Sequence, residues 1–241
     1  MFSRRLLRNT SFFTHTIRQI HTPHPLAFEP QKGLGQLFKP ESLTNFYEHH
    51  NRLIEKLNAL VADTEYEDDS LRVLIQKTAQ LPEKAQLFNY ASQIWNNDFF
   101  LQSLSDDSES QRDAVLTDRL KKEFGSQENF DTQFINSALA IFGSGWTWLA
   151  ETEYQVLRVI NSYNAGTVLD TTRTQENDLN TSIPNPSAGA QLQPTKLNPL
   201  LSVCVWEHAY LRDHGIDGRE RYLKAFLQHV NWGVVGKRMG L

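Results

Sequence analysis

The sequence LFNYASQIWNNDFF, residues 87–100, forms the aromatic centre of a long helix predicted for residues 83–104. A second long helix is predicted for residues 41–61, where apolar residues recur at helical spacing. Between them, residues 70–79 predict a short helix that Pro82 ends. Two long helices joined in this way are expected to pack as an antiparallel hairpin.

The rest of the chain predicts a mixed half. Residues 105–113 include four acidic residues and no bulky apolar one, which is typical of a linker. Beyond this linker we expect helices at 114–124, 127–141, 206–214 and 220–236, and strands at 146–150, 154–161 and 200–205. The predicted fold class is α+β. An N-terminal helical hairpin domain covers residues 23–107, and an α/β domain at 108–241 has helices around a three-stranded antiparallel sheet.

A polar insert at residues 170–198 interrupts the second half. It is rich in Thr, Asn, Gln, Ser and Pro and poor in large apolar residues, so it cannot bury enough surface to order itself. Loops of this length in a compact domain are usually functional or disordered. The insert is therefore a candidate partner-binding arm.

The N-terminus indicates a compartment. Residues 1–28 contain no acidic side chain, while Arg4, Arg5, Arg8 and Arg18 are interspersed with apolar residues, Ser and Thr. This composition is typical of a mitochondrial transit peptide, which we place at residues 1–22 with cleavage between 20 and 23. The alternative is a basic tail that binds nucleic acid.

Composition limits the partners. The chain has 24 Lys and Arg against 28 Asp and Glu, and loss of the four leader arginines lowers the net charge from −4 to near −8. An acidic body opposes a broad nucleic-acid surface, although Lys121 and Lys122, or Lys237 and Arg238, could make limited contact with ribosomal RNA. The apolar stretches are too short and interrupted to span a membrane. Protein partners are favoured, and a membrane role is not expected.

Four blocks resemble the iron/manganese superoxide dismutases and occur in that family's order. They are residues 87–100, the sequence FGSGWTWL at 142–149, NAG at 164–166 and VWEHAY at 205–210. The resemblance runs from about residue 26 to 232, apart from the polar insert. It implies the fold of that family.

The same resemblance puts the metal chemistry in doubt. The family holds its metal with three histidines and an aspartate, and the corresponding positions here are Asn45, Asn97, Cys204 and His208. Amide oxygens are weak neutral donors and a thiolate selects softer metals, so only His208 is a suitable ligand for iron or manganese. Cys204 and His208 alone are too few for a structural zinc site. We therefore expect no catalytic residues, no metal and no other cofactor.

The residues of a subunit interface can be retained after catalytic activity is lost. In the family, the glutamate beside the last histidine ligand reaches across the subunit interface. The resemblance therefore implies a possible pairing surface of His49, Glu207, His208 and Leu211, although Leu211 replaces a family tyrosine. The alternatives are a solvated or capping role for Glu207 and a hydrogen-bonded histidine between helices for His49.

Dismutase-like proteins occur in the small subunit of fungal mitochondrial ribosomes, and this chain resembles them. The resemblance implies a structural constituent of that subunit in the mitochondrial matrix, without enzyme activity. Its partners would be mitochondrial ribosomal proteins, including a related dismutase-like subunit. One alternative is an active mitochondrial superoxide dismutase that holds its metal with His50, His214 or His229 alongside His208. The other is a metal-free interaction protein outside the ribosome.

Overall fold

The computed structural model describes residues 21–106, 112–170 and 196–240. The predicted transit peptide, apart from its last two residues, lies outside the described residues. So does the polar insert, apart from its ends, and so does the middle of the predicted linker. Within the described part, no helix is long and apolar enough to cross a membrane.

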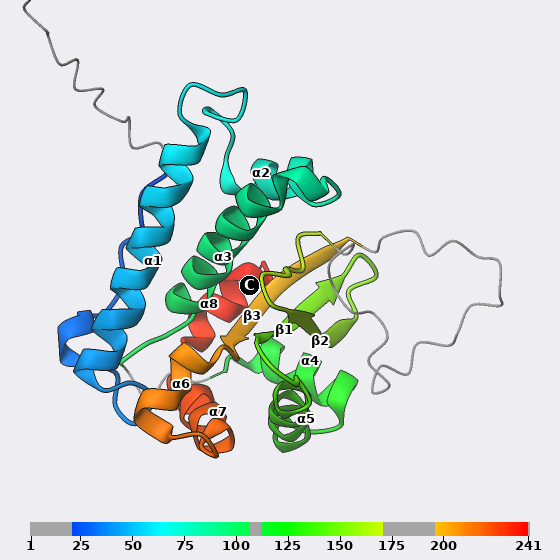
Figure 1. The fold of residues 1–241 in the computed structure, drawn as a ribbon. Helices are drawn as coiled ribbons and strands as arrows, with labels where there is room; N and C mark the ends of the chain where they lie inside the picture. The colour runs from blue at the N-terminus through cyan, green and yellow to red at the C-terminus, as the bar shows by residue number, and fades with distance from the viewer. Residues whose placement is uncertain (1–20, 107–111, 171–195, 241) are drawn as a thin grey trace, which may run out of the picture.

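The N-terminal half forms the predicted helical hairpin. Helices α1 (Pro40–Val61) and α3 (Ala85–Gln102) lie side by side, with the short helix α2 (Leu71–Thr78) packed against α3 (Figure 1). Proline opens α1, where its missing N–H has no helical partner to lose. The Ser70 side chain caps α2 by accepting a hydrogen bond from the Val73 N–H.

The C-terminal half begins with α4 (Ala114–Phe124) and α5 (Gln127–Leu139) and continues into a sheet of β1 (Gly145–Thr152), β2 (Leu157–Tyr163) and β3 (Leu197–Cys204). The strand order is β2-β1-β3 and both pairings are antiparallel, which confirms the predicted fold class. Strand β2 begins three residues later than predicted, because residues 153–156 form the turn, with Gln155 at a φ of 59°.

Strand β3 contains a bulge. Leu149 pairs with Leu201 but Ala150 pairs with Pro199, so one extra residue of β3 lies between them. Proline has no N–H for a sheet ladder and is tolerated at a bulge on an edge strand.

The chain closes with α6 (Glu207–His214), α7 (Arg219–Gln228) and α8 (Trp232–Arg238). The prediction of one helix at 220–236 was wrong, because the backbone at 229–231 leaves the helix to bond with residues 103–105. Ser105 donates to the His229 carbonyl and Asn231 donates to the Ser103 carbonyl, both at 2.8 Å. The Asn231 side chain then caps α8.

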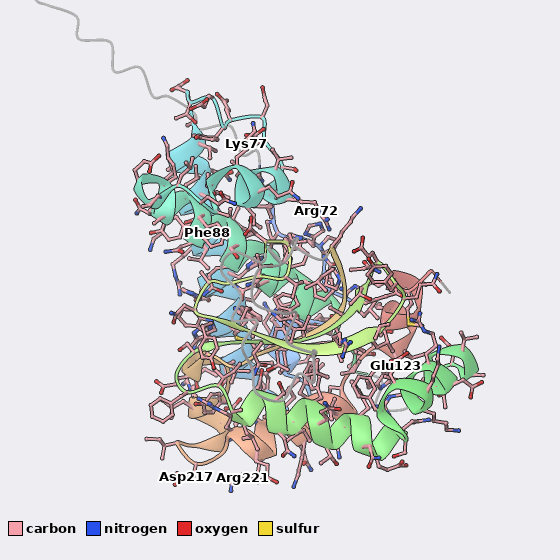
Figure 2. All side chains as sticks on the ribbon, turned by 90° about the vertical axis from the view of Figure 1, so that its right-hand side faces the viewer. Arg72, Lys77, Phe88, Glu123, Asp217 and Arg221 are labelled. Atoms are coloured by element: carbon pink, nitrogen blue, oxygen red, sulfur yellow. The ribbon has the colours of Figure 1, made fainter. Side chains whose placement is uncertain are left out.

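Two apolar clusters form the core. The larger one joins residues of α1 and α3, such as Phe46 and Phe100, to the sheet and to α7. The smaller one lies within the hairpin around Leu57 and Phe88. Phe88 and Asp217, from the two halves, lie towards opposite ends of the molecule (Figure 2). The larger core crosses the predicted domain boundary near residue 107, and the division into two domains stays a prediction.

Candidate functional site

The four positions that correspond to family ligands do not form one donor cluster. Asn45 on α1 and His208 on α6 are exposed, whereas Asn97 on α3 and Cys204 at the end of β3 are buried. The Asn97 Oδ1 atom is buried and has no hydrogen-bond partner among the residues that the structure describes. Burial raises the pKa of the Cys204 thiol far above its usual range, so Cys204 is a neutral thiol rather than a thiolate ligand.

These residues do not fit a redox-active iron or manganese ion. Such a site needs imidazole and anionic oxygen donors, and His208 is the single member of the four that provides either. Among residues 21–106, 112–170 and 196–240, no group of three or more His, Cys, Asp or Glu side chains is placed to hold a metal ion. Leu53, on the same helix as Asn45, is buried in the smaller apolar cluster.

The histidines of the alternative metal site, in an active dismutase, make hydrogen bonds at separate places in the fold. His50 bonds to the Asp98 carboxylate on α3, with 3.0 Å between Nε2 and Oδ1. His214 bonds to the Leu37 carbonyl and His229 bonds to the Ala225 carbonyl. The fold therefore does not converge these rings on His208.

The candidate pairing surface is different, because the fold brings its histidines together. The His208 ring lies 5.4 Å from the ring of His49, 5.4 Å from Phe46 and 5.6 Å from Trp206, measured between centroids. Although His208 has an exposed side, contact with these rings partly desolvates its imidazole, and this effect, with a smaller one of His49, lowers the pKa of His208 to about 4. Burial also lowers the pKa of His49, helped by Arg52 and Lys56. Both rings are therefore neutral at physiological pH.

Glu207 and Leu211 extend this surface along α6. They lie four residues apart and thus share one face of the helix. Both are exposed, Leu211 at 42%. Glu207 makes no ion pair with any residue of the described part. An exposed leucine beside an unpaired carboxylate is free for a partner.

Sequence reasoning missed Phe142. This side chain is 98% exposed in the loop between α5 and β1. Arg219 holds the loop by donating to the carbonyls of Ile141 and Gly143, and it also bonds to the Tyr210 hydroxyl on α6. The sequence shows Phe142 directly before the glycines of a predicted tight turn. The turn accounts for the glycines but gives no reason for a large apolar side chain there.

The start of α1 fixes α6 in place. The Asp213 carboxylate accepts from the Lys39 N–H and from the Ser42 hydroxyl, at 2.7 Å each. Arg212 pairs with Glu41 beside it. The α6 residues of the candidate pairing surface thus lie on a helix that is bonded to the start of α1, in the opposite half of the chain.

Comparison with known proteins agrees with this geometry. Residues 112–238 match the model for iron/manganese superoxide dismutases, C-terminal domain. The chain is 34% identical to small ribosomal subunit protein mS43 of Schizosaccharomyces pombe, over 97% of this chain and 92% of that protein. It is 34% identical to an iron superoxide dismutase of Legionella pneumophila, over 80% and 85% of the two chains. It is 36% identical to the enzyme of Campylobacter jejuni, over 85% and 84%. The chain belongs to the iron/manganese superoxide dismutase family.

Proposed function

We propose that this protein is a structural constituent of the mitochondrial small ribosomal subunit, built on a superoxide dismutase fold that no longer holds a metal. One observation carries the proposal. Similarity to mS43 extends over nearly the whole of both chains, while three of the four family ligand positions hold Asn45, Asn97 and Cys204.

The absence of enzyme activity follows from donor chemistry. Two amide side chains and a buried neutral thiol cannot balance the charge of an oxidised iron or manganese ion. The remaining imidazole, His208, packs against aromatic rings of this chain. Two clusters of apolar side chains form the core, which supports retention of the fold as a scaffold.

The proposed location is the mitochondrial matrix. The arginine-rich, acid-free residues 1–28 support import, and the net charge near −8 without the leader favours docking through proteins over broad RNA contact. Contact with ribosomal RNA would be limited to local basic residues.

The proposed partner is a related dismutase-like subunit on the pairing surface of His49, Glu207, His208 and Leu211, to which we add Phe142. Exposed apolar side chains next to ordered polar ones are typical of an interface. A partner of the same fold would present its corresponding helix to α6.

Co-sedimentation tests this function. A tagged full-length chain expressed in its own cells should migrate with the small ribosomal subunit in a gradient, and should stay there after a moderate salt wash. Tagged protein found free in the matrix would contradict the proposal.

Metal analysis distinguishes the proposed structural role from an active superoxide dismutase. Iron and manganese should be well below one ion per chain in purified protein, and dismutase activity should be absent. One ion per chain together with activity would establish the enzyme. Metal-free protein that never sediments with the subunit would instead support an interaction protein outside the ribosome.

A further inference from the structure

The segment at residues 21–28, here called the N-terminal arm, is bonded to the helical hairpin. The His21 N–H donates to Asn58 Oδ1 at 3.0 Å, and Asn58 Nδ2 donates back to the His21 carbonyl at 2.9 Å. One side-chain amide on α1 thus satisfies both backbone groups of a single arm residue. With the arm in place, Asn58 is 2% exposed, so these two hydrogen bonds are buried.

A second contact lies three residues further along the arm. Asp98 on α3 is 6% exposed, and two imidazoles lie close to its carboxylate. His50 Nε2 lies 3.0 Å from Oδ1, and His24 Nδ1 of the arm lies 3.1 Å from Oδ2. The His24 contact is at ion-pairing distance but lacks hydrogen-bond geometry, so the arm stays close to this buried carboxylate without bonding to it.

Apolar contacts complete the attachment. Phe28 is 7% exposed within the larger core, and Leu26 packs against that core. The arm therefore belongs to the folded body from His21 onward.

We propose that the mature protein retains the arm from His21, and that a processing peptidase removes the leader at the bond between residues 20 and 21 or before it. The proposal rests on the import into mitochondria proposed above. Hydrolysis adds one water across the peptide bond, so the leader leaves with a carboxylate and the arm gains an α-ammonium group. At the 20–21 bond, that ammonium still donates to Asn58 Oδ1.

The composition of the leader suggests that it ends at residue 22, which is two residues beyond residue 20, the last residue that the proposal assigns to it. Cleavage after Thr22 would remove His21, and both ends of the Asn58 amide would lose their hydrogen-bond partner in the protein. The docking contacts therefore set a limit on processing that composition does not show.

The first test identifies the mature N-terminus. The full-length precursor is imported into isolated mitochondria, recovered, and its N-terminal peptide is labelled at the amino group and identified by mass spectrometry. We expect an N-terminus at His21 or at an earlier residue. An N-terminus at Thr22 or later, or a precursor that stays uncut, would overturn the proposal.

The second test is a double-mutant cycle on purified protein. Chains that begin at His21 and at Pro23 are released from a removable fusion partner so that no extra residue remains. Each is compared with its Asn58→Ala variant, and Glu55→Ala on the exposed side of α1 is the matched control.

In the chain from His21, Asn58→Ala should lower the thermal midpoint by about 2–6 °C. Starting at Pro23 should lower it by a similar amount, and Asn58→Ala should then have little further effect because the amide already lacks its partner. Additive losses of thermal midpoint, or no loss when His21 is removed, would overturn the proposed attachment of the arm to Asn58. Neither test depends on co-sedimentation, so a failure of the ribosomal proposal would be seen separately.

Discussion

The Asp213 carboxylate on α6 accepts a hydrogen bond from the Ser42 hydroxyl on α1, with 2.7 Å between Oδ1 and Oγ. Its other oxygen accepts from the backbone N–H of Lys39, the residue that precedes α1 and has no side-chain cap of its own. A carboxylate from a distant helix thus does what a capping box does locally.

Asp213→Ala should therefore lower the free energy of unfolding by about 1–3 kcal/mol, because two donors lose a charged acceptor. Urea denaturation measures this. The control is Asp217→Ala, an exposed residue in the α6–α7 loop that Figure 2 labels, where the change should stay within about 0.5 kcal/mol. Equal midpoints for the two variants would show that the cap contributes nothing.

Arg238 is a second long-range clamp. It donates to the Ser103 hydroxyl and to the carbonyls of Leu200 and Phe99, and its guanidinium lies 3.6 Å from the centre of the Phe99 ring. Burial lowers its pKa to about 10, so desolvation opposes these contacts. We expect the contacts to dominate because three acceptors lose their donor. Arg238→Met should therefore cost about 2–3 kcal/mol in the free energy of unfolding, against little change for exposed Lys237→Met. An Arg238→Met chain as stable as the unaltered protein would show that desolvation balances the contacts.

His208 should make stability depend on pH. Its pKa is about 4 in the folded chain against an ordinary value of 6.5, so the unfolded chain takes up a proton first as the pH falls. Stability should therefore decline between pH 6.5 and about 4 and level off below. Because His208 keeps an exposed edge, solvent screening limits the effect.

His208→Gln should remove about 2–4 °C of the acid-induced fall in thermal midpoint, as measured by scanning calorimetry across this range. Lys237→Gln, at an exposed side chain on α8, serves as the comparison. Identical pH profiles for His208→Gln and the unaltered chain would rule out His208 as the titrating group.

Cys204 should be unreactive in the folded protein. The residue is fully buried and the pKa of its thiol is raised by that burial, so the thiolate is scarce and hidden. Alkylation by iodoacetamide at pH 8 should be at least about 100-fold slower than in denaturant, because it must wait for opening of the core. As the single cysteine of the chain, it can be followed by mass without ambiguity. Rapid labelling of the native protein would mean that the end of β3 is open.

Phe142→Ser should weaken partner binding without weakening the fold. The ring is 98% exposed, so its loss should leave the thermal midpoint unchanged. If Phe142 contacts the proposed partner, the fraction of tagged protein that co-sediments with the small subunit should fall about tenfold.

Tyr154→Ser is the matched control for Phe142→Ser. Tyr154 is 79% exposed in the turn that follows β1, whereas Phe142 precedes β1, so the strand's length separates the two. Equal co-sedimentation of both variants would exclude Phe142 from the interface.

Much of the fold was predictable because it depends on local patterns. The helix at residues 41–61 was predicted from apolar spacing and differs from α1 by one residue. The break between α7 and α8 was missed: Asn231 is a residue type that favours a helix start, but only the structure shows that residues 229–231 bond to residues 103–105. The late start of β2 was missed because the turn residues Tyr154 and Gln155 have ordinary strand-like neighbours.

The candidate site divides in the same way. The side chains at the former ligand positions Asn45, Asn97 and Cys204 are facts of the sequence, and their donor chemistry already argues against iron or manganese. That the His49 and His208 rings meet, that Phe142 is exposed, and that His21 is tied to Asn58 required coordinates.

The sequence by itself determined the order of elements, the family and the loss of metal donors, because helical periodicity and the chemistry of a side chain are carried by neighbouring residues. Only the tertiary structure decided which surface remains for a partner and where the folded body begins. Both depend on contacts between residues far apart in the chain, such as Asp213 with Ser42 and Asn58 with His21, whose side chains have no local pattern to reveal the pairing.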